Sequence, residues 1–146
     1  QKHHGHKMHI ATDTNGVIKK VIATTASTHD STQFDALTED EEKAIFADSG
    51  YMSKERKKQL RDKGIFNGIV ERRVRGQSKL RAKQSRNNQR FAKTRGLVEL
   101  AFAFMKHHMN FKETRYLGLE KNQEHFCLIA ACANLRRVPQ LMKAYG

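Results

Sequence analysis

The sequence lacks the features of disulfide-rich, membrane-spanning and secreted proteins. It has no tryptophan, one proline and two cysteines among 146 residues. Cys127 and Cys132 fall in one apolar segment, so we expect no disulfide framework and a reducing compartment. No apolar run approaches the roughly 20 residues that a membrane helix requires. Residues 1–9 lack the apolar stretch of a signal peptide. These absences, with 38% hydrophobic residues, favour a single globular domain over 1–146 in the cytoplasm.

Acidic residues are scarce in most of the chain. The net charge is +13, and residues 51–146 hold 23 Lys or Arg against seven Asp or Glu. Between Arg72 and Val98 there is no acid at all. Such a density of positive charge neutralises phosphates, so we expect salt-sensitive binding to nucleic acid. The alternative is a solvated surface or a flexible basic loop. The predicted contacts in this run are Arg72, Arg73, Arg75, Lys79, Arg81, Lys83, Arg86, Arg90, Lys93 and Arg95.

Turn-forming residues divide the first part of the chain. Two strand-like runs flank Asp13–Gly16, whose sequence Asp-Thr-Asn-Gly is turn chemistry, so residues 6–25 predict a β-hairpin. The stretch THDSTQFDALTED is expected to be a loop leading into a short helix, with Asp30 or Ser31 as its N-cap.

Two short apolar runs flank a charged segment in the middle of the chain. Residues 43–47 and 65–70 are predicted to be short strands. The segment between them predicts a helix over about 53–63, with Ser53 as a cap and Gly64 as its end.

The last part of the chain is expected to be helical. Residues of about 71–86 have no apolar period and predict a basic loop. A long helix should follow from about 86 to 108, and an apolar helix over 123–138 should end near Pro139. The order of strands and helices predicts an α/β fold with a mixed sheet flanked by helices.

Asp48 follows the predicted strand 43–47 directly. A small turn, Ser49–Gly50, comes next. On one interpretation Asp48 only opens the turn and caps the following helix. On the other, the strand holds a carboxylate at the sheet edge, where a metal or substrate can reach it.

A narrow polar stripe runs along the predicted long helix. At about 100° per residue, Arg95, Glu99, Phe102 and Lys106 lie within about 60° of one another on one face. Arg95 and Glu99 could be a simple i, i+4 ion pair. Together with Asp48, however, Glu99 could provide a second carboxylate from a separate element, as two-metal nucleases require. The residues assigned to the apolar face are Leu97, Val98, Leu100, Ala101, Phe104 and Met105.

Several stretches resemble one known family. ADSGY, at 47–51, resembles the second-aspartate motif of bacterial insertion-sequence transposases of the DDE class. The spacing of Arg95, Glu99 and Lys106 is similar to their C-terminal Y-x2-R-x3-E-x6-K motif. Further stretches similar to the insertion sequence 4/5 superfamily, in the family's order, are GHKMHIATD, GVIKKVIATTASTHDS and RYLGLEKN.

The resemblance implies an RNase H-like catalytic core that performs metal-dependent cleavage and strand transfer of transposon-end DNA. Asp48 would be the second metal-binding acid and Glu99 the third, with Mg²⁺ or Mn²⁺ as the cofactor. Arg95 and Lys106 would contact DNA or the scissile phosphate. The implied partner is double-stranded DNA, at transposon ends and target, in the bacterial cytoplasm at the nucleoid. A homodimer is a further partner that the resemblance allows.

Two features of the sequence depart from the family's pattern. Ala92 stands where the C-terminal motif has tyrosine. The family's first aspartate lies on a strand before the hairpin, and that strand is missing here. Asp13 is explained by its turn, and Asp30 reads as a loop or cap residue. We therefore expect the chain to be the C-terminal part of a transposase, lacking the first strand, that binds DNA without cutting it.

Other functions and sites are weaker alternatives. The chain could be a non-catalytic nucleic-acid-binding remnant of a truncated transposase, or a plain RNase H-type nuclease. Phe102 could stack on a base, although packing is the commoner role of such a residue. Cys127 and Cys132 read as core residues. The N-terminal histidines fit a basic strand better than a metal site, because no zinc-like spacing accompanies them: His3, His4, His6 and His9.

Overall fold

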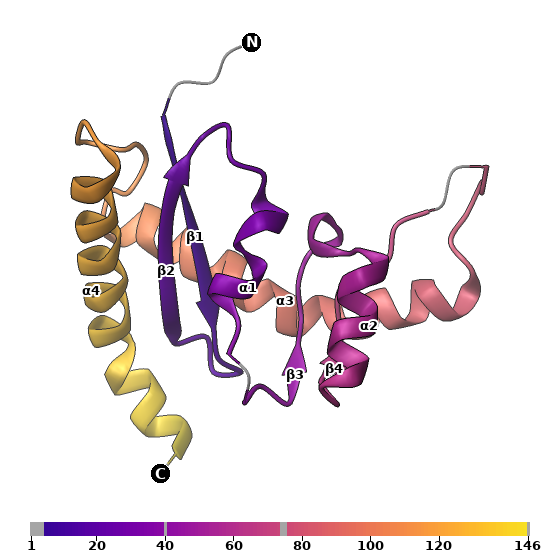
Figure 1. Cartoon of the computed structure of the whole chain (residues 1–146). Coiled ribbons are helices and arrows are strands. Elements are labelled where there is room, and N and C mark those ends of the chain that lie inside the picture. Colours follow the sequence, from indigo (N-terminus) through magenta and orange to yellow (C-terminus); the bar gives the residue numbers. More distant parts are fainter. Residues whose placement is uncertain (1–4, 40, 74–75, 146) are drawn as a thin grey trace. The chain divides into compact units, whose positions relative to one another are not determined.

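The chain forms two compact units (Figure 1). The computed structural model describes residues 5–39, 41–73 and 76–145. One unit combines residues 1–29 with 97–146, and the other comprises residues 30–96. Each has its own two-stranded sheet, one antiparallel and one parallel. The predicted α/β class is therefore confirmed. Over the described residues, the strands form these two ladders rather than the one mixed sheet that the sequence predicts.

The first unit begins with the predicted hairpin. β1 (His6–Thr12) pairs antiparallel with β2 (Ile18–Thr25), and the register shifts between Ala11 and Thr12. Oδ1 of Asp13 accepts hydrogen bonds from the N–H groups of Asn15 and Val17, each at 2.8 Å. The aspartate thus closes the turn, which confirms its predicted role.

Amide side chains of α4 (Leu119–Tyr145) bind the edge of β2 that β1 does not cover. Asn134 accepts from the N–H of Ile18 and donates to its carbonyl, both at 2.9 Å. Gln123 accepts from the N–H of Ala23 at 2.6 Å and donates to the carbonyl of Val21 at 3.0 Å. Because unpaired backbone groups are costly to bury, these amides let the helix pack directly beside β2 (Figure 1).

The core of this unit combines the hairpin, α4 and the C-terminal half of α3 (Ala82–His108). The buried side chains lie on faces that repeat with the helical period of α3 and α4. Met105 and Phe126 are completely buried. The other residues of the core are Ile10, Ile18, Ala101, Ala130 and Ala133.

Two predictions for α4 are wrong. The helix begins at Leu119, before the predicted start at 123, and it continues past Pro139 to Tyr145. A proline inside a helix removes one hydrogen bond and can bend the helix instead of ending it. The yellow part of α4 changes direction in Figure 1. Arg137, just before the proline, donates to the backbone carbonyls of Gly16 and Asn15, which fixes this part of the helix against the hairpin.

The second unit contains a short parallel ladder. β3 (Ala44–Ile45) pairs with β4 (Phe66–Asn67). Backbone bonds from Phe66 to Lys43, from Gly68 to Ile45 and from Val70 to Ala47 extend the pairing. The two predicted strands are thus present as one ladder, although their regular part is short.

Gly68 allows the close packing of this ladder. A Cβ atom there would lie 2.3 Å from Cδ1 of Phe46 and 3.0 Å from the carbonyl oxygen of Ile45. Phe46 in turn packs with Phe66 and Phe91, with ring centroids 5.5 to 6.1 Å apart. The remaining buried core of the unit is Phe34, Ile45, Leu60, Ile65 and Ile69.

α2 (Lys54–Asp62) crosses between the two strands as predicted. The Ser53 hydroxyl accepts from the N–H of Arg56 at 3.0 Å, which confirms the cap. Gly64, with φ +69°, follows the helix in the left-handed conformation that favours glycine. The pKa of Glu55 is lowered, because its carboxylate accepts hydrogen bonds from its own backbone N–H and from the Ser53 hydroxyl.

The remaining elements of this unit differ in detail from prediction. A 3-10 turn, η1 (Asp30–Gln33), leads into α1 (Phe34–Leu37), so Gln33 and not Asp30 or Ser31 is the N-cap of α1. α3 begins at Ala82, within the predicted loop 71–86. Among the described residues, no helix is both long and apolar enough to cross a membrane.

Candidate active site

Asp48 lies where the parallel ladder ends. β3 and the residues after it lead the chain to Asp48, which precedes the 3-10 turn η2 (Ser49–Tyr51). Oδ1 of Asp48 accepts from the Ser49 N–H at 2.7 Å, so Asp48 caps the turn η2 and does not cap the following helix α2, whose cap is Ser53. The Asp48 side chain is nevertheless 67% exposed. A carboxylate held by its own turn and open to solvent can also bind a cation.

Two arginines lie beside this carboxylate. Nη1 of Arg95, on α3, is 3.9 Å from Oδ1 of Asp48. Nε of Arg72 donates to the Ser49 hydroxyl at 2.6 Å, and that hydroxyl is 3.4 Å from the same Oδ1. Three of the predicted site residues, Asp48, Arg72 and Arg95, therefore meet within one unit. Guanidinium groups in this position suit phosphate oxygens.

The pKa of Tyr51 depends partly on the charges of this site. Burial raises the pKa of its phenol above the ordinary value of 10.0, and the carboxylates of Asp30 and Asp48 raise the pKa further, against an opposing effect of Arg56. Arg56 lies over the Phe34 ring at 4.2 Å and donates to the carbonyls of Tyr51 and Ser31. Arg56 thus fixes the turn that carries Asp48.

Glu99 and Lys106 are exposed residues on the part of α3 that belongs to the first unit. Their roles in the active site stay predictions. Phe102 packs against the hydrophobic core, which favours packing over base stacking. Leu100 was assigned to the apolar face, but it is 64% exposed. The buried face is centred on Ala101 and Met105, and Leu100 lies about 100° or more away from both on the helix.

The predicted DNA contacts are mostly exposed. Arg95 is the exception, because it is half-buried beside Asp48. Arg73 donates to the Ser78 carbonyl at 3.0 Å, which orders part of the connection before α3. Arg75 lies outside the described residues. The exposed members of the predicted set are Arg72, Arg73, Lys79, Arg81, Lys83, Arg86, Arg90, Lys93 and Lys106.

Comparison with known proteins identifies the family. Residues 1–135 match the family described as "Transposase DDE domain". The chain belongs to this family. The sequence resemblance to insertion-sequence DDE transposases is thereby confirmed.

One curated relative of this DDE domain is the transposase for insertion sequence element IS1106 of Neisseria meningitidis serogroup B. The two are 30% identical over 142 residues. These residues are 96% of this chain and 49% of the relative, so the chain spans about half the length of the curated relative it matches. No solved structure matches the chain.

Within the described part of this DDE domain, no three His, Cys, Asp or Glu residues come together in a group that could hold a metal. His3 and His4 lie outside the described residues. His9 is buried, and its Nε2 is 2.8 Å from the Thr24 hydroxyl. The role of Asp48 as a metal ligand stays a prediction, which its exposure to solvent allows.

Three features of the DDE domain were missed from sequence. The cations of α2 were read only as part of a helix. Glu71 was passed over, although it holds α2 and α3 together. Gln84 accepts from the N–H of Arg81 at 3.0 Å and so helps α3 to begin early. A glutamine three residues after Arg81, the residue that precedes the helix, was a usable signal for this last feature.

Proposed function

We propose that this chain is part of the catalytic domain of a DNA transposase, with an RNase H-like core, acting in metal-dependent cleavage and strand transfer at transposon ends. The observation that supports this best is the exposed Asp48 carboxylate flanked by Arg95 and Arg72, in a chain of the DDE family. The relative's printed name, a transposase for an insertion sequence, agrees with this substrate class. Such a protein would act on double-stranded DNA in the bacterial cytoplasm, at the nucleoid.

Asp48 and Glu99 are the proposed metal-binding acids. Carboxylate oxygens are the ligands that Mg²⁺ and Mn²⁺ prefer, and these ions keep several waters, so few protein ligands suffice. Bound divalent ions would activate the attacking oxygen and stabilise the leaving oxygen of the phosphodiester. Arg95 and Lys106 would bind phosphate oxygens of the DNA, which Arg95 can do with two parallel hydrogen bonds.

Two acids of the triad are thus assigned to this chain, and the first is not. We therefore expect the chain of 146 residues to bind double-stranded DNA without cleaving it. A labelled duplex incubated with the chain and Mn²⁺ tests this directly. Clean cleavage that Asp48→Asn abolishes would contradict the assignment of only two acids.

Calorimetric titration with Mn²⁺ tests the metal ligands. We expect weak binding that Asp48→Asn and Glu99→Gln each remove. Asp62→Asn and Glu113→Gln are matched controls, because they remove an exposed carboxylate from the same two units without touching the proposed site. Binding that survives both site variants, or that the controls weaken equally, would contradict the proposed ligands.

The second candidate is a DNA-binding remnant without catalytic chemistry. The hydrogen bond from Ser49 N–H to Asp48 favours it, since a structural role alone accounts for that contact. This candidate predicts DNA binding with no heat of Mn²⁺ binding. The homodimer is also a prediction, which sedimentation of the free chain would test.

A further inference from the structure

The outer face of α2 is rich in basic residues. Arg56 and Leu60 face the interior of the second unit, where Leu60 is buried in the core. Lys54, Lys58 and Arg61, at i, i+4 and i+7, share the opposite face of the helix, and all three are exposed. α2 thus places Leu60 in the core and these three cations outside, where Arg61 also lies beside Asp62, with Nε 3.7 Å from Oδ1.

Glu71 connects this helix to the first turns of α3. Nζ of Lys57 lies 3.4 Å from Oε1 of Glu71, and Gln84 donates to its Oε2. The Glu71 backbone also bonds with the Asn88 side chain, N–H to Oδ1 at 3.2 Å and carbonyl to Nδ2 at 3.1 Å. Glu71 is the only acid between Lys63 and Val98. Its charge is used in holding the two basic helices together.

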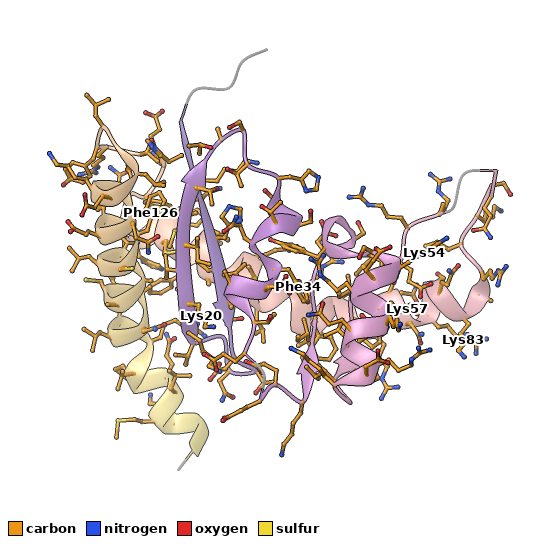
Figure 2. The ribbon with its side chains drawn as sticks, viewed as in Figure 1. Lys20, Phe34, Lys54, Lys57, Lys83 and Phe126 are labelled. Carbon is orange, nitrogen blue, oxygen red and sulfur yellow. The ribbon has the colours of Figure 1, made fainter. Side chains whose placement is uncertain are left out.

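The same contacts bring α2 and the start of α3 together. Figure 2 labels Lys54 and Lys57 on α2 and Lys83 near the start of α3, in the same part of the second unit. Lys83 precedes Gln84 in the sequence. Gln84 binds Oε2 of Glu71, and Lys57 lies beside Oε1 of the same carboxylate. Lys57 of α2 and the first turn of α3 therefore meet at Glu71.

We propose that the outer face of α2, through Lys54, Lys58 and Arg61, is a second binding surface for the phosphate backbone of double-stranded DNA, on the helix that Glu71 connects to the start of α3. This inference rests on the proposed function, because it names a further surface for the same DNA partner. The three residues span about 10 Å along the helix, which is the rise of about three phosphates on one strand.

The chemistry of this face favours duplex DNA over other anionic partners. α2 has no aromatic residue on which an unpaired base could stack, so it lacks the usual platform for single strands. Its one large apolar residue, Leu60, is buried, so the helix has no apolar side to insert into a lipid headgroup layer. Cations without base-reading groups give affinity without sequence preference.

Fluorescence anisotropy with a labelled duplex of arbitrary sequence, in EDTA and over a range of salt concentrations, tests the inference. The variant carries Lys54→Gln, Lys58→Gln and Arg61→Gln together. Its matched control carries Lys112→Gln, Lys121→Gln and Lys143→Gln, which remove the same charge from exposed positions of the first unit. Circular dichroism establishes that both triple variants fold, and the single variants Lys58→Gln and Arg61→Gln replace the triple if it does not.

Log K falls as log salt rises, and we expect the α2 variant to make this slope less steep by about 2 to 3, close to 0.9 per lost phosphate contact. The matched control should make it less steep by less than about 1. Equal slopes for the two variants, or a single-stranded competitor as effective as duplex, would overturn the inference. If the unmodified chain does not bind duplex at all, the proposed function fails as well. If Arg86→Gln and Arg90→Gln weaken binding while the α2 variant does not, only the α2 surface is wrong.

Discussion

The guanidinium of Arg95 lies 3.9 Å from the same Asp48 oxygen that accepts the Ser49 N–H. One carboxylate oxygen therefore serves the turn η2 and a cation on α3 together. A divalent ion bound by Asp48 would have to share this oxygen with Arg95, or use the other one. Arg95 thus connects the metal-binding and DNA-binding proposals within one unit.

Replacement of Arg95 by glutamine should change the binding of Mn²⁺ and the binding of duplex DNA in opposite directions. Removal of the neighbouring positive charge should tighten Mn²⁺ binding, by up to about fivefold, because exposed ion pairs contribute about 0.2–1 kcal/mol. Duplex DNA should bind more weakly. Lys112→Gln is the control, since it removes one positive charge from an exposed residue of the first unit that is not a predicted DNA contact. Calorimetry and anisotropy measure the two effects, and a loss of Mn²⁺ affinity in Arg95→Gln would contradict this view.

The phenol of Tyr51 should report the charge on Asp48. Its pKa is raised by burial first and by Asp30 and Asp48 next. Asp48→Asn should therefore lower the Tyr51 pKa without returning it to 10.0, because burial remains. Absorbance of the phenolate during an alkaline titration measures the change, with Tyr51→Phe to identify the signal. An unchanged titration in Asp48→Asn would contradict the effect of Asp48.

The same shift makes stability depend on pH in the alkaline range. A phenol whose pKa is raised by folding favours the folded state fully below the unfolded pKa of about 10, and this contribution is lost as the pH rises through the folded pKa. The difference in unfolding free energy between the unmodified chain and Tyr51→Phe should thus be constant near neutral pH and change only above about pH 10. Urea denaturation at several pH values measures it.

Gly68→Ala should destabilise the second unit. The added methyl group would meet Phe46 at 2.3 Å, and overpacking of this kind costs about 1–3 kcal/mol. Gly96→Ala in α3 is the matched control, because a Cβ there meets no atom within 4 Å. It should raise stability by about 0.5–1 kcal/mol through the helix preference of alanine. Urea denaturation compares the two, and a tolerated Gly68→Ala would show that Phe46 can move.

Asn134→Ala should weaken the packing of α4 on β2. The change leaves the N–H and carbonyl of Ile18 without their side-chain partner, at a cost of about 1–3 kcal/mol. Gln140→Ala, an exposed change on the same helix, should alter stability by less than about 0.5 kcal/mol. Hydrogen exchange at the Ile18 amide should become faster in Asn134→Ala alone.

The features that sequence analysis predicted correctly depend on neighbouring residues. The turn at Asp13, the Ser53 cap and the end of α2 at Gly64 each involve residues within four positions of one another. Their chemistry is therefore visible in a short stretch of sequence. The position of Asp48 after a strand was predictable for the same reason.

The features that were missed depend on contacts between distant segments. Nothing local shows that Arg95 reaches Asp48, or that Arg72 reaches Ser49. Pro139 was predicted to end the helix because proline breaks helices. The helix continues instead, and Arg137 binds the distant hairpin in this part of it. The early start of α3 depends partly on Glu71, whose backbone binds Asn88.

Gln123 and Asn134 have a consequence beyond the packing of α4. A strand edge with free N–H and carbonyl groups is a template on which another chain can add a strand, and this is a common route to aggregation. On β2 the amides occupy these groups at Ile18, Val21 and Ala23. A β-rich segment of another molecule would have to displace α4 before it could pair there. Two side-chain amides thus protect the hairpin from growth into a fibril along this edge.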